Sequence, residues 1–143
     1  MRRFCESNGI QIRPATTYTP EQNGVAERAM RTITENARSM LIDAGLAKSY
    51  WLDAILTATY VRNRYPTSKS GGEITPFELF RGKRPNLKYI RIFGSKCYRY
   101  IEKHQRSKFD SKTKECILVG YTSNGYVVED RETGKRYYKT RKQ

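Results

Sequence analysis

The chain has 143 residues, 37% of them hydrophobic and 12% aromatic, which is enough for the core of one ordinary domain or two small ones. Its 28 Lys and Arg side chains outnumber 14 Asp and Glu, and the net charge of +14 indicates a polyanionic partner, most simply nucleic acid. Three widely spaced cysteines and one histidine exclude a disulfide framework and a Cys/His zinc site, and no apolar run is long enough to cross a membrane.

The charge is unevenly distributed along the chain. Residues 1–65 carry 9 basic and 6 acidic side chains, a net charge of +3, whereas residues 66–143 carry 19 and 8, a net charge of +11. We therefore expect the second half to make most of the contacts with a polyanion. The cysteine pattern predicts reduced thiols, which are typical of an intracellular protein.

The N-terminal half has a helical pattern. A short helix is predicted from Arg2 to Ser7, followed by a stop at Asn8-Gly9 and a short strand from Ile10 to Arg13. A long amphipathic helix comes next, with Asn23 as candidate N-cap and Gly45 as candidate C-cap. Its apolar side chains recur at three- and four-residue steps, at Ala26, Met30, Ile33, Ala37, Met40, Leu41 and Ala44.

A second long helix is predicted from Ser49, as N-cap, to about Asn63, because a proline three residues later prevents much extension. Its buried stripe is predicted at Trp51, Ile55, Ala58 and Val61. After a polar connector, Thr75 and Glu78 match a capping box with proline at the first helical position. This motif predicts a short helix that ends near Gly82.

From Tyr89 onward the pattern favours β-structure. Runs rich in β-branched and aromatic residues are separated by turns at Ser123-Asn124-Gly125 and Glu132-Thr133-Gly134. The predicted strands are Ile90 to Ile101, Cys116 to Tyr121, Gly125 to Glu129 and Arg136 to Lys139. Short strands at this spacing predict a small barrel.

Basic residues of the second half are interleaved with aromatic ones. Lys and Arg can neutralise phosphates, and exposed tyrosines can stack on bases. The alternative is an antiparallel strand with one face in the core, which makes Tyr98 and Tyr100 core residues. The dense C-terminal run is less well explained that way, and it supplies the DNA-binding candidates Lys135, Arg136, Lys139, Arg141 and Lys142. The loop from Lys103 to Lys114 is a second candidate surface, with Arg106, Lys108 and Lys112.

Glu27 lies in the first turn of the long amphipathic helix, with Arg31 and Arg38 behind it on the same face. A glutamate there complements the helix dipole and can pair with Arg31 four residues later, so a solvated helix face is one interpretation. The other interpretation is a functional carboxylate. Basic side chains of this helix, Arg28, Arg31 and Arg38, are further DNA-binding candidates.

The residues around Glu27 resemble the end of the catalytic core of Ty1/copia-type retrotransposon integrases. The resemblance begins at Tyr18-Thr19-Pro20, continues through Gln22 to Arg28 and Arg31 to Ile33, and covers nearly the whole chain. The sequence departs from the family pattern at Ala29 and Met30, where the family often has a basic residue and an asparagine. Further motifs in the family's order are Trp51, Asn63-Arg64-Tyr65-Pro66, Thr75-Pro76-Phe77-Glu78, Arg81-Gly82-Lys83-Arg84-Pro85, Phe93-Gly94 and Val119-Gly120-Tyr121. The resemblance implies that Glu27 is the third member of a catalytic carboxylate triad that binds Mg²⁺ or Mn²⁺ in the complete enzyme.

The two aspartates of that triad have no counterpart here, since in the family the second lies upstream of the position that matches Phe4. The nearby carboxylates Glu6, Glu21, Asp43 and Asp53 lack the strand-borne spacing of the missing pair. We therefore expect no catalysis by the chain alone and no tightly bound metal. Whether the chain is an enzyme stays open, because it resembles a polynucleotidyl transferase that lacks two of three metal-binding carboxylates.

The predicted fold is α+β. Residues 1–65 are expected to form a truncated ribonuclease-H-like, helical remnant of the integrase core, residues 66–87 a connector with a short helix, and residues 88–143 an SH3-like β barrel. The resemblance implies DNA binding and DNA integration in the complete parent protein. The alternative is a non-catalytic nucleic-acid-binding or protein-interaction module retained from a transposable element.

The expected partners are DNA and the rest of the Pol polyprotein, with no membrane. An apolar helix stripe left without its core would also allow self-association. We expect an intracellular location, in the nucleus.

Overall fold

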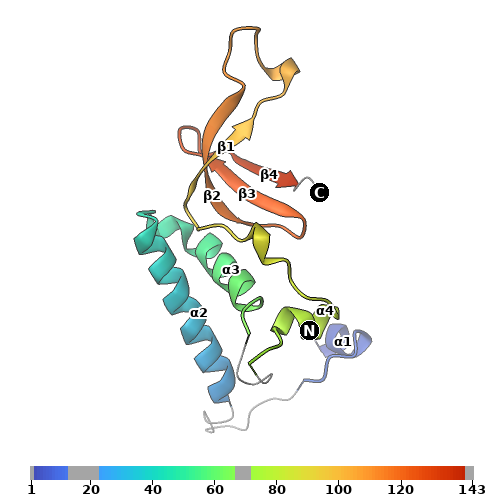
Figure 1. Ribbon diagram of the computed structural model, residues 1–143. Coiled ribbons are helices and arrows are strands. Elements are labelled where there is room, and N and C mark those ends of the chain that lie inside the picture. Colours follow the sequence, from blue (N-terminus) through green and yellow to red (C-terminus); the bar gives the residue numbers. More distant parts are fainter. Residues whose placement is uncertain (1, 13–22, 67–71, 141–143) are drawn as a thin grey trace. The chain divides into compact units, whose positions relative to one another are not determined.

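The computed structural model describes residues 2–12, 23–66 and 72–140 (Figure 1). The chain divides into two units, residues 1–32 and 33–143. Helices occupy the N-terminal part of the described chain, and a four-stranded antiparallel sheet occupies the C-terminal part. The architecture is therefore α+β, as predicted. No helix in the described ranges is both long and apolar enough to span a bilayer.

Helix α1 (Arg2–Ser7) ends where the sequence predicts. The Asn8 side chain donates a hydrogen bond to the Phe4 carbonyl (2.8 Å), and Gly9 adopts φ +67°. The strand predicted from Ile10 is wrong for residues 10–12, which form no strand. A strand needs a partner for its N–H and C=O groups, and residues 10–12 pair with no other described strand. The last predicted residue, Arg13, lies outside the described residues.

Helix α2 (Gly24–Asp43) confirms the long amphipathic helix. The chain leaves it through Gly45 at φ +60°, the left-handed conformation that glycine adopts beyond helix C-termini. The predicted apolar stripe is buried only in the second half of the helix. Ala37 is buried and Met40 packs beside it, whereas Met30 is 63% exposed.

Helix α3 (Trp51–Arg62) begins one residue later than predicted, with Tyr50 at the N-cap position. Ser49 lies in a short 3-10 turn (Lys48–Tyr50) and is not the N-cap. The buried side of α3 carries small side chains, at Ala54, Thr57 and Ala58. Trp51, predicted to be buried, is 57% exposed: it is the first residue of α3 and lines an open groove with side chains of α2 and α3.

Helix α4 (Pro76–Arg81) is capped at both ends as predicted. Thr75 Oγ1 accepts a hydrogen bond from the Glu78 backbone N–H (3.1 Å), and proline occupies the first helical position. Gly82 ends the helix at φ +67°. A short helix of this kind depends on such caps, because few of its own hydrogen bonds can form.

The sheet is a meander in which each strand pairs with the next. The strands are β1 (Lys96–Tyr100), β2 (Thr113–Tyr121), β3 (Gly125–Asp130) and β4 (Arg136–Thr140). A β-bulge between Leu118 and Gly120 shifts the register of β2 against β3. The predicted strands are confirmed, although β1 is shorter than the predicted run from Ile90 to Ile101.

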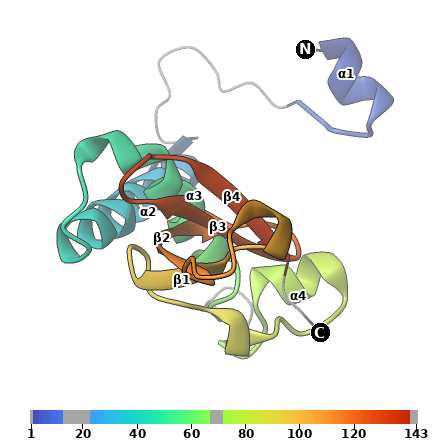
Figure 2. The same ribbon diagram turned by 90° about the horizontal axis from the view of Figure 1, so that it is seen from above.

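The two faces of the sheet bury different side chains. Successive residues of β2 point to opposite faces, so Ile117 and Val119 face one core and Cys116 and Leu118 the other. The first core is shared with α3, which lies across that face (Figure 2). Helices and sheet therefore stabilise one another. Whether residues 1–65, 66–87 and 88–143 behave as separate domains stays a prediction.

Candidate nucleic-acid interface

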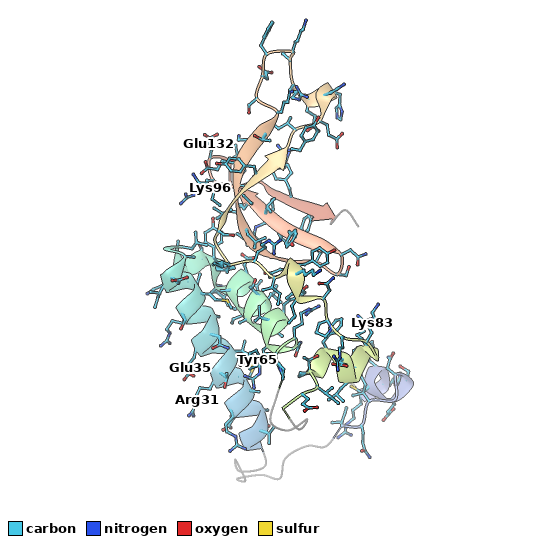
Figure 3. All side chains as sticks on the ribbon, viewed as in Figure 1. Arg31, Glu35, Tyr65, Lys83, Lys96 and Glu132 are labelled. Atoms are coloured by element: carbon cyan, nitrogen blue, oxygen red, sulfur yellow. The ribbon has the colours of Figure 1, made fainter. Side chains whose placement is uncertain are left out.

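Glu27 lies in the first turn of α2 with an exposed side chain. Arg28 and Arg31 are exposed on the same helix, and Arg31 is labelled in Figure 3. No ion pair joins Glu27 to Arg31 among the described residues, although their spacing allows one. Arg38, further along α2, is also exposed and lines a groove of about 720 Å³ together with apolar side chains of α2 and α3.

The described residues do not build a metal centre around Glu27. Within residues 2–12, 23–66 and 72–140, no three His, Cys, Asp or Glu side chains gather in a group that could hold a metal ion. Mg²⁺ requires near-octahedral oxygen ligands, and a two-metal site needs several carboxylates. The described side chains therefore do not fit such a site on their own, and the metal-binding role of Glu27 stays a prediction.

The structure places only part of the C-terminal basic run. Lys135 is exposed just before β4, and its ammonium lies 5.7 Å from the ring centre of the tyrosine two residues later. It forms no ion pair within the described part of the chain, so it is open to a phosphate. Lys139 belongs to β4, whereas Arg141 and Lys142 lie outside the described residues.

Arg136 is held by two carboxylates. Its Nη1 and Nη2 donate to both oxygens of Asp53 on α3 (3.0 and 2.7 Å), and its Nε donates to Glu129 Oε2 on β3 (2.8 Å). The Tyr50 hydroxyl donates to the other oxygen of Glu129, and this hydrogen bond, together with burial, raises the pKa of Tyr50. A phosphate contact by Arg136 stays a prediction, and it would compete with these bonds.

Strand β1 presents two tyrosines to solvent. Tyr98 and Tyr100 are 64% and 52% exposed, so their assignment to the core is wrong. Cys97 lies opposite the buried Cys116 in the β1–β2 register, so its side chain faces the core. Because side chains alternate along a strand, every second residue of β1 from Cys97 also faces inward. Arg99 therefore lies on the inner side, with its guanidinium carbon 4.0 Å from the centre of a tyrosine ring on β4.

Cys97 and Cys116 are free thiols, as expected from the sequence. Burial raises the pKa of Cys97 to about 11, and burial also raises the pKa of Cys116. Both thiols are protonated at neutral pH, so neither is poised as a nucleophile or as a metal ligand.

The loop between β1 and β2 carries cations without carboxylate partners. Those exposed and without an ion pair among the described residues are Lys103, Lys108 and Lys112. By contrast, Lys96 at the other end of the hairpin reaches Glu115 (3.0 Å), and Lys114 reaches Asp130 (2.9 Å). The unpaired lysines therefore gather toward the end of the hairpin, which supports the loop as a candidate surface for phosphates.

Our sequence reasoning missed Phe109, which is 95% exposed in this loop. The signal that could have found it is a lone phenylalanine between a lysine and an aspartate, in a loop otherwise built of polar residues. A phenylalanine among polar loop residues has no apolar neighbours to pack against, so its ring is expected to stay exposed.

Comparison with known proteins places these features in a family. Residues 95–141 match the family model described as "Retroviral polymerase SH3-like domain", and these residues include all four strands. The chain is 41% identical over 129 residues to the "Retrovirus-related Pol polyprotein from transposon TNT 1-94" of Nicotiana tabacum, covering 89% of the chain and 10% of that protein. It is 33% identical over 136 residues to the Pol polyprotein from transposon RE1 of Arabidopsis thaliana, covering 94% of the chain and 9% of that protein.

A third relative is much shorter. The chain is 39% identical over 98 residues to an "Uncharacterized mitochondrial protein" of Arabidopsis thaliana, which covers 68% of the chain and 75% of that protein. The chain thus spans about a tenth of the length of the Pol polyproteins that it matches, and most of this short relative. No solved structure matches the chain.

Proposed function

Because the chain belongs to the family of copia-type retrotransposon Pol polyproteins and carries their SH3-like domain, we propose that it is a DNA-binding part of an integrase. The complete polyprotein would integrate element DNA, and this chain would hold element ends or target DNA. Residues 1–65 are proposed to be the helical end of a ribonuclease-H-like core. Its partners would be DNA and the rest of the polyprotein, and integration into chromosomes would place it in the nucleus.

The observation that carries this proposal is the distribution of unpaired positive charge. Residues 66–143 hold a net charge of +11, and their lysines in the β1–β2 loop and before β4 have no carboxylate partner in the described part of the chain. Unpaired cations on a small sheet support binding through phosphates.

Glu27 would act only in the complete protein. There it would supply one carboxylate for Mg²⁺ or Mn²⁺, and the other ligands would come from outside these 143 residues. The chain's own contribution would be to carry that carboxylate on the first turn of α2, with Arg28 and Arg31 beside it to contact DNA. Neither arginine forms an ion pair among the described residues.

The test is a salt titration of binding to one fluorescent DNA duplex. We expect binding to depend only weakly on DNA sequence. A plot of the logarithm of the association constant against the logarithm of the salt concentration should have a slope of about −0.9 for each phosphate neutralised. The first variant replaces the C-terminal cations but spares Arg136, which stabilises the fold: Lys135→Gln, Lys139→Gln, Arg141→Gln and Lys142→Gln. It should flatten the slope and weaken binding to every sequence alike.

The matched variant is Arg28→Gln with Arg31→Gln, which should change the slope less. If these two arginines govern the slope and the C-terminal cations do not, the charge distribution has been misinterpreted. The sheet would then be better explained as a protein-docking module.

The short mitochondrial relative favours a second candidate function. The matched residues cover 75% of that protein, which is therefore of comparable length, and its name does not include a Pol polyprotein. The second candidate is a non-catalytic nucleic-acid-binding or protein-interaction module retained from a transposable element. The two candidates differ in one measurement, because only the integrase part should restore metal-dependent DNA nicking when the upstream Pol segment of a relative is supplied.

A further inference from the structure

Strands β1 and β2 extend beyond the sheet as a two-stranded arm. The register of β3 against β2 begins at Cys116, so Tyr98–Tyr100 and Thr113–Glu115 pair only with each other among the described strands. One further bond, from Ile101 N–H to the Lys112 carbonyl (2.9 Å), continues the pairing into the loop. The hairpin projects past the other strands in Figure 1. We call residues 98–115 the β1–β2 arm.

The tip of the arm is a closed turn. The Asp110 N–H donates to the Ser107 carbonyl (3.2 Å), and the Asp110 carboxylate accepts from the Ser107 N–H (2.7 Å). Lys108 and Phe109 are the two central residues of this turn. Behind it, Arg106 Nε donates to the carbonyl of Ile101 (3.2 Å) and closes the base of the loop. The turn therefore holds the backbone on both sides of Phe109 and presents its ring outward.

The environment of Phe109 combines an apolar ring with cations. The ring is 95% exposed, and Lys103, Lys108 and Lys112 in the same loop have no carboxylate partner within the described residues. The free energy falls when an apolar ring leaves water, and it also falls when a lysine ammonium pairs with an anion. One surface that offers both within a few ångströms is duplex DNA, with stacked bases between phosphate strands.

We propose that Phe109 is a wedge that inserts between adjacent base pairs of duplex DNA while Lys108 and Lys112 contact the flanking phosphates. This rests on the proposed function, DNA binding, and adds its mode: local unstacking and a bend of the duplex at the arm. Apolar side chains on DNA-binding elements act this way in proteins that kink DNA. A two-stranded ribbon is also narrow enough to approach a groove.

The test compares Phe109→Ala with Phe80→Ala in the full chain. Phe80 on α4 is 85% exposed and lies outside the arm, so its loss removes a similar ring from a different surface. DNA bending is measured by energy transfer between dyes at the two duplex ends, and unstacking by the fluorescence of an internal 2-aminopurine. The wild type and Phe80→Ala should bend and unstack the duplex alike.

Phe109→Ala should weaken binding about tenfold and abolish both signals, with the salt slope unchanged because no phosphate contact is lost. Lys108→Gln should have the opposite effect. The DNA bend should persist, and the magnitude of the salt-dependence slope should decrease by about 0.9 because one phosphate contact is lost. Circular dichroism melting of each variant checks folding, which an exposed ring should not affect.

Each other outcome overturns a specific claim. If the wild type does not bind DNA, the proposed function fails and the wedge with it. If the wild type binds but Phe109→Ala behaves like Phe80→Ala, the wedge is wrong and DNA binding stands. If Phe109→Ala leaves bending intact but abolishes binding to phosphatidylcholine vesicles that contain phosphatidylserine, the arm is a membrane contact instead.

Discussion

Gly94 lies where the chain passes close to the end of α2 before entering β1. Its φ is +75°, and a Cβ at this position would overlap the Cβ of Ala44. The Gly94 N–H also donates to the Leu118 carbonyl (2.8 Å), which anchors the segment to β2. Neither the backbone nor the neighbouring alanine can move without disturbing the helix or the sheet.

We predict that Gly94→Ala lowers the free energy of unfolding by about 3 kcal/mol, because the left-handed backbone and the overlap both act against a side chain. The control is Gly134→Ala, which has a similar φ of +65° but open space around it. It should cost about 1 kcal/mol. Urea unfolding of both variants measures the difference, and equal losses would show that the close approach to Ala44 is unimportant.

Asp130 organises the turn between β3 and β4. Its carboxylate accepts from the N–H groups of Glu132 (3.0 Å) and Thr133 (3.2 Å), and it pairs with the Lys114 ammonium (2.9 Å). The hydrogen bond from Lys114 is the main cause that lowers the pKa of Asp130 to about 2, against the opposing effect of desolvation and with help from the two backbone donors.

This lowered pKa predicts an acid-sensitive turn. The folded-state pKa lies below the ordinary value of 3.8, so the ionised carboxylate stabilises the fold above about pH 4, and this contribution is lost as the pH falls toward 2. Asp130→Asn should therefore be less stable near neutral pH and lose less stability between pH 5 and 2. Glu132→Gln, which removes an exposed partner of the same lysine, should keep the acid dependence of the wild type. The measurement is the urea unfolding midpoint of the wild type, Asp130→Asn and Glu132→Gln at several pH values. If the midpoint depends on pH in the same way for all three proteins, Asp130 is not the source of the acid sensitivity.

At the scale of elements, the Arg136 network joins the β3–β4 hairpin to the start of α3. Asp53 and Glu129 have side chains only 12% and 8% exposed, so each needs a cationic partner. The planar guanidinium meets both carboxylates at once, with two parallel bonds to Asp53, which a lysine cannot reproduce. Helix and hairpin are thus tied at a polar edge beside their shared apolar core.

We predict that Arg136→Met lowers the free energy of unfolding by about 3 kcal/mol, because it leaves two largely buried carboxylates without their partner. Arg136→Lys should recover only part of this loss. Lys135→Met, at the exposed neighbour, should change stability by about 0.5 kcal/mol or less. Thermal and urea unfolding provide the measurement, and a neutral Arg136→Met would mean that the network is solvated in solution.

For the molecule as a whole, the carboxylates lead to a prediction about catalysis. If Glu27 is the triad member that the resemblance implies, it is the single triad carboxylate predicted for this chain, and one carboxylate cannot position two metal ions. With Mg²⁺ or Mn²⁺ and a labelled duplex, we expect no nicking or strand transfer by the chain alone. Metal-dependent nicking that Glu27→Gln abolished would refute this expectation.

A complementation assay gives the positive control. Adding the upstream Pol segment of a relative, to which the resemblance assigns the two aspartates, should produce nicking that depends on Glu27. Glu35→Gln, further along α2, should leave the restored activity unchanged.

Features that depend on neighbours along the chain can be predicted from the sequence. The side-chain cap at Thr75, the glycine that follows α2 at Gly45 and the turn at Gly134 are local hydrogen-bond and backbone requirements, and the structure confirms each. The run from Cys116 to Tyr121 is apolar enough to predict a strand in any context. The excess of positive charge, and hence the expectation of a polyanion, is likewise independent of folding.

Long-range packing sets which side chains face inward and which charges are already paired. Tyr98 and Arg99 alternate in the sequence, and nothing local shows that the arginine lies inside, because the register with Cys116 sets it. In the sequence, Arg136 belongs to a run of basic residues. In the folded chain its guanidinium is paired with Asp53, which lies 83 positions away. Phe109 becomes a candidate contact only because a closed turn presents it beyond the core. Strand pairing and long-range ion pairs depend on the packing of segments that are distant in the sequence, so they cannot be predicted from a local sequence pattern.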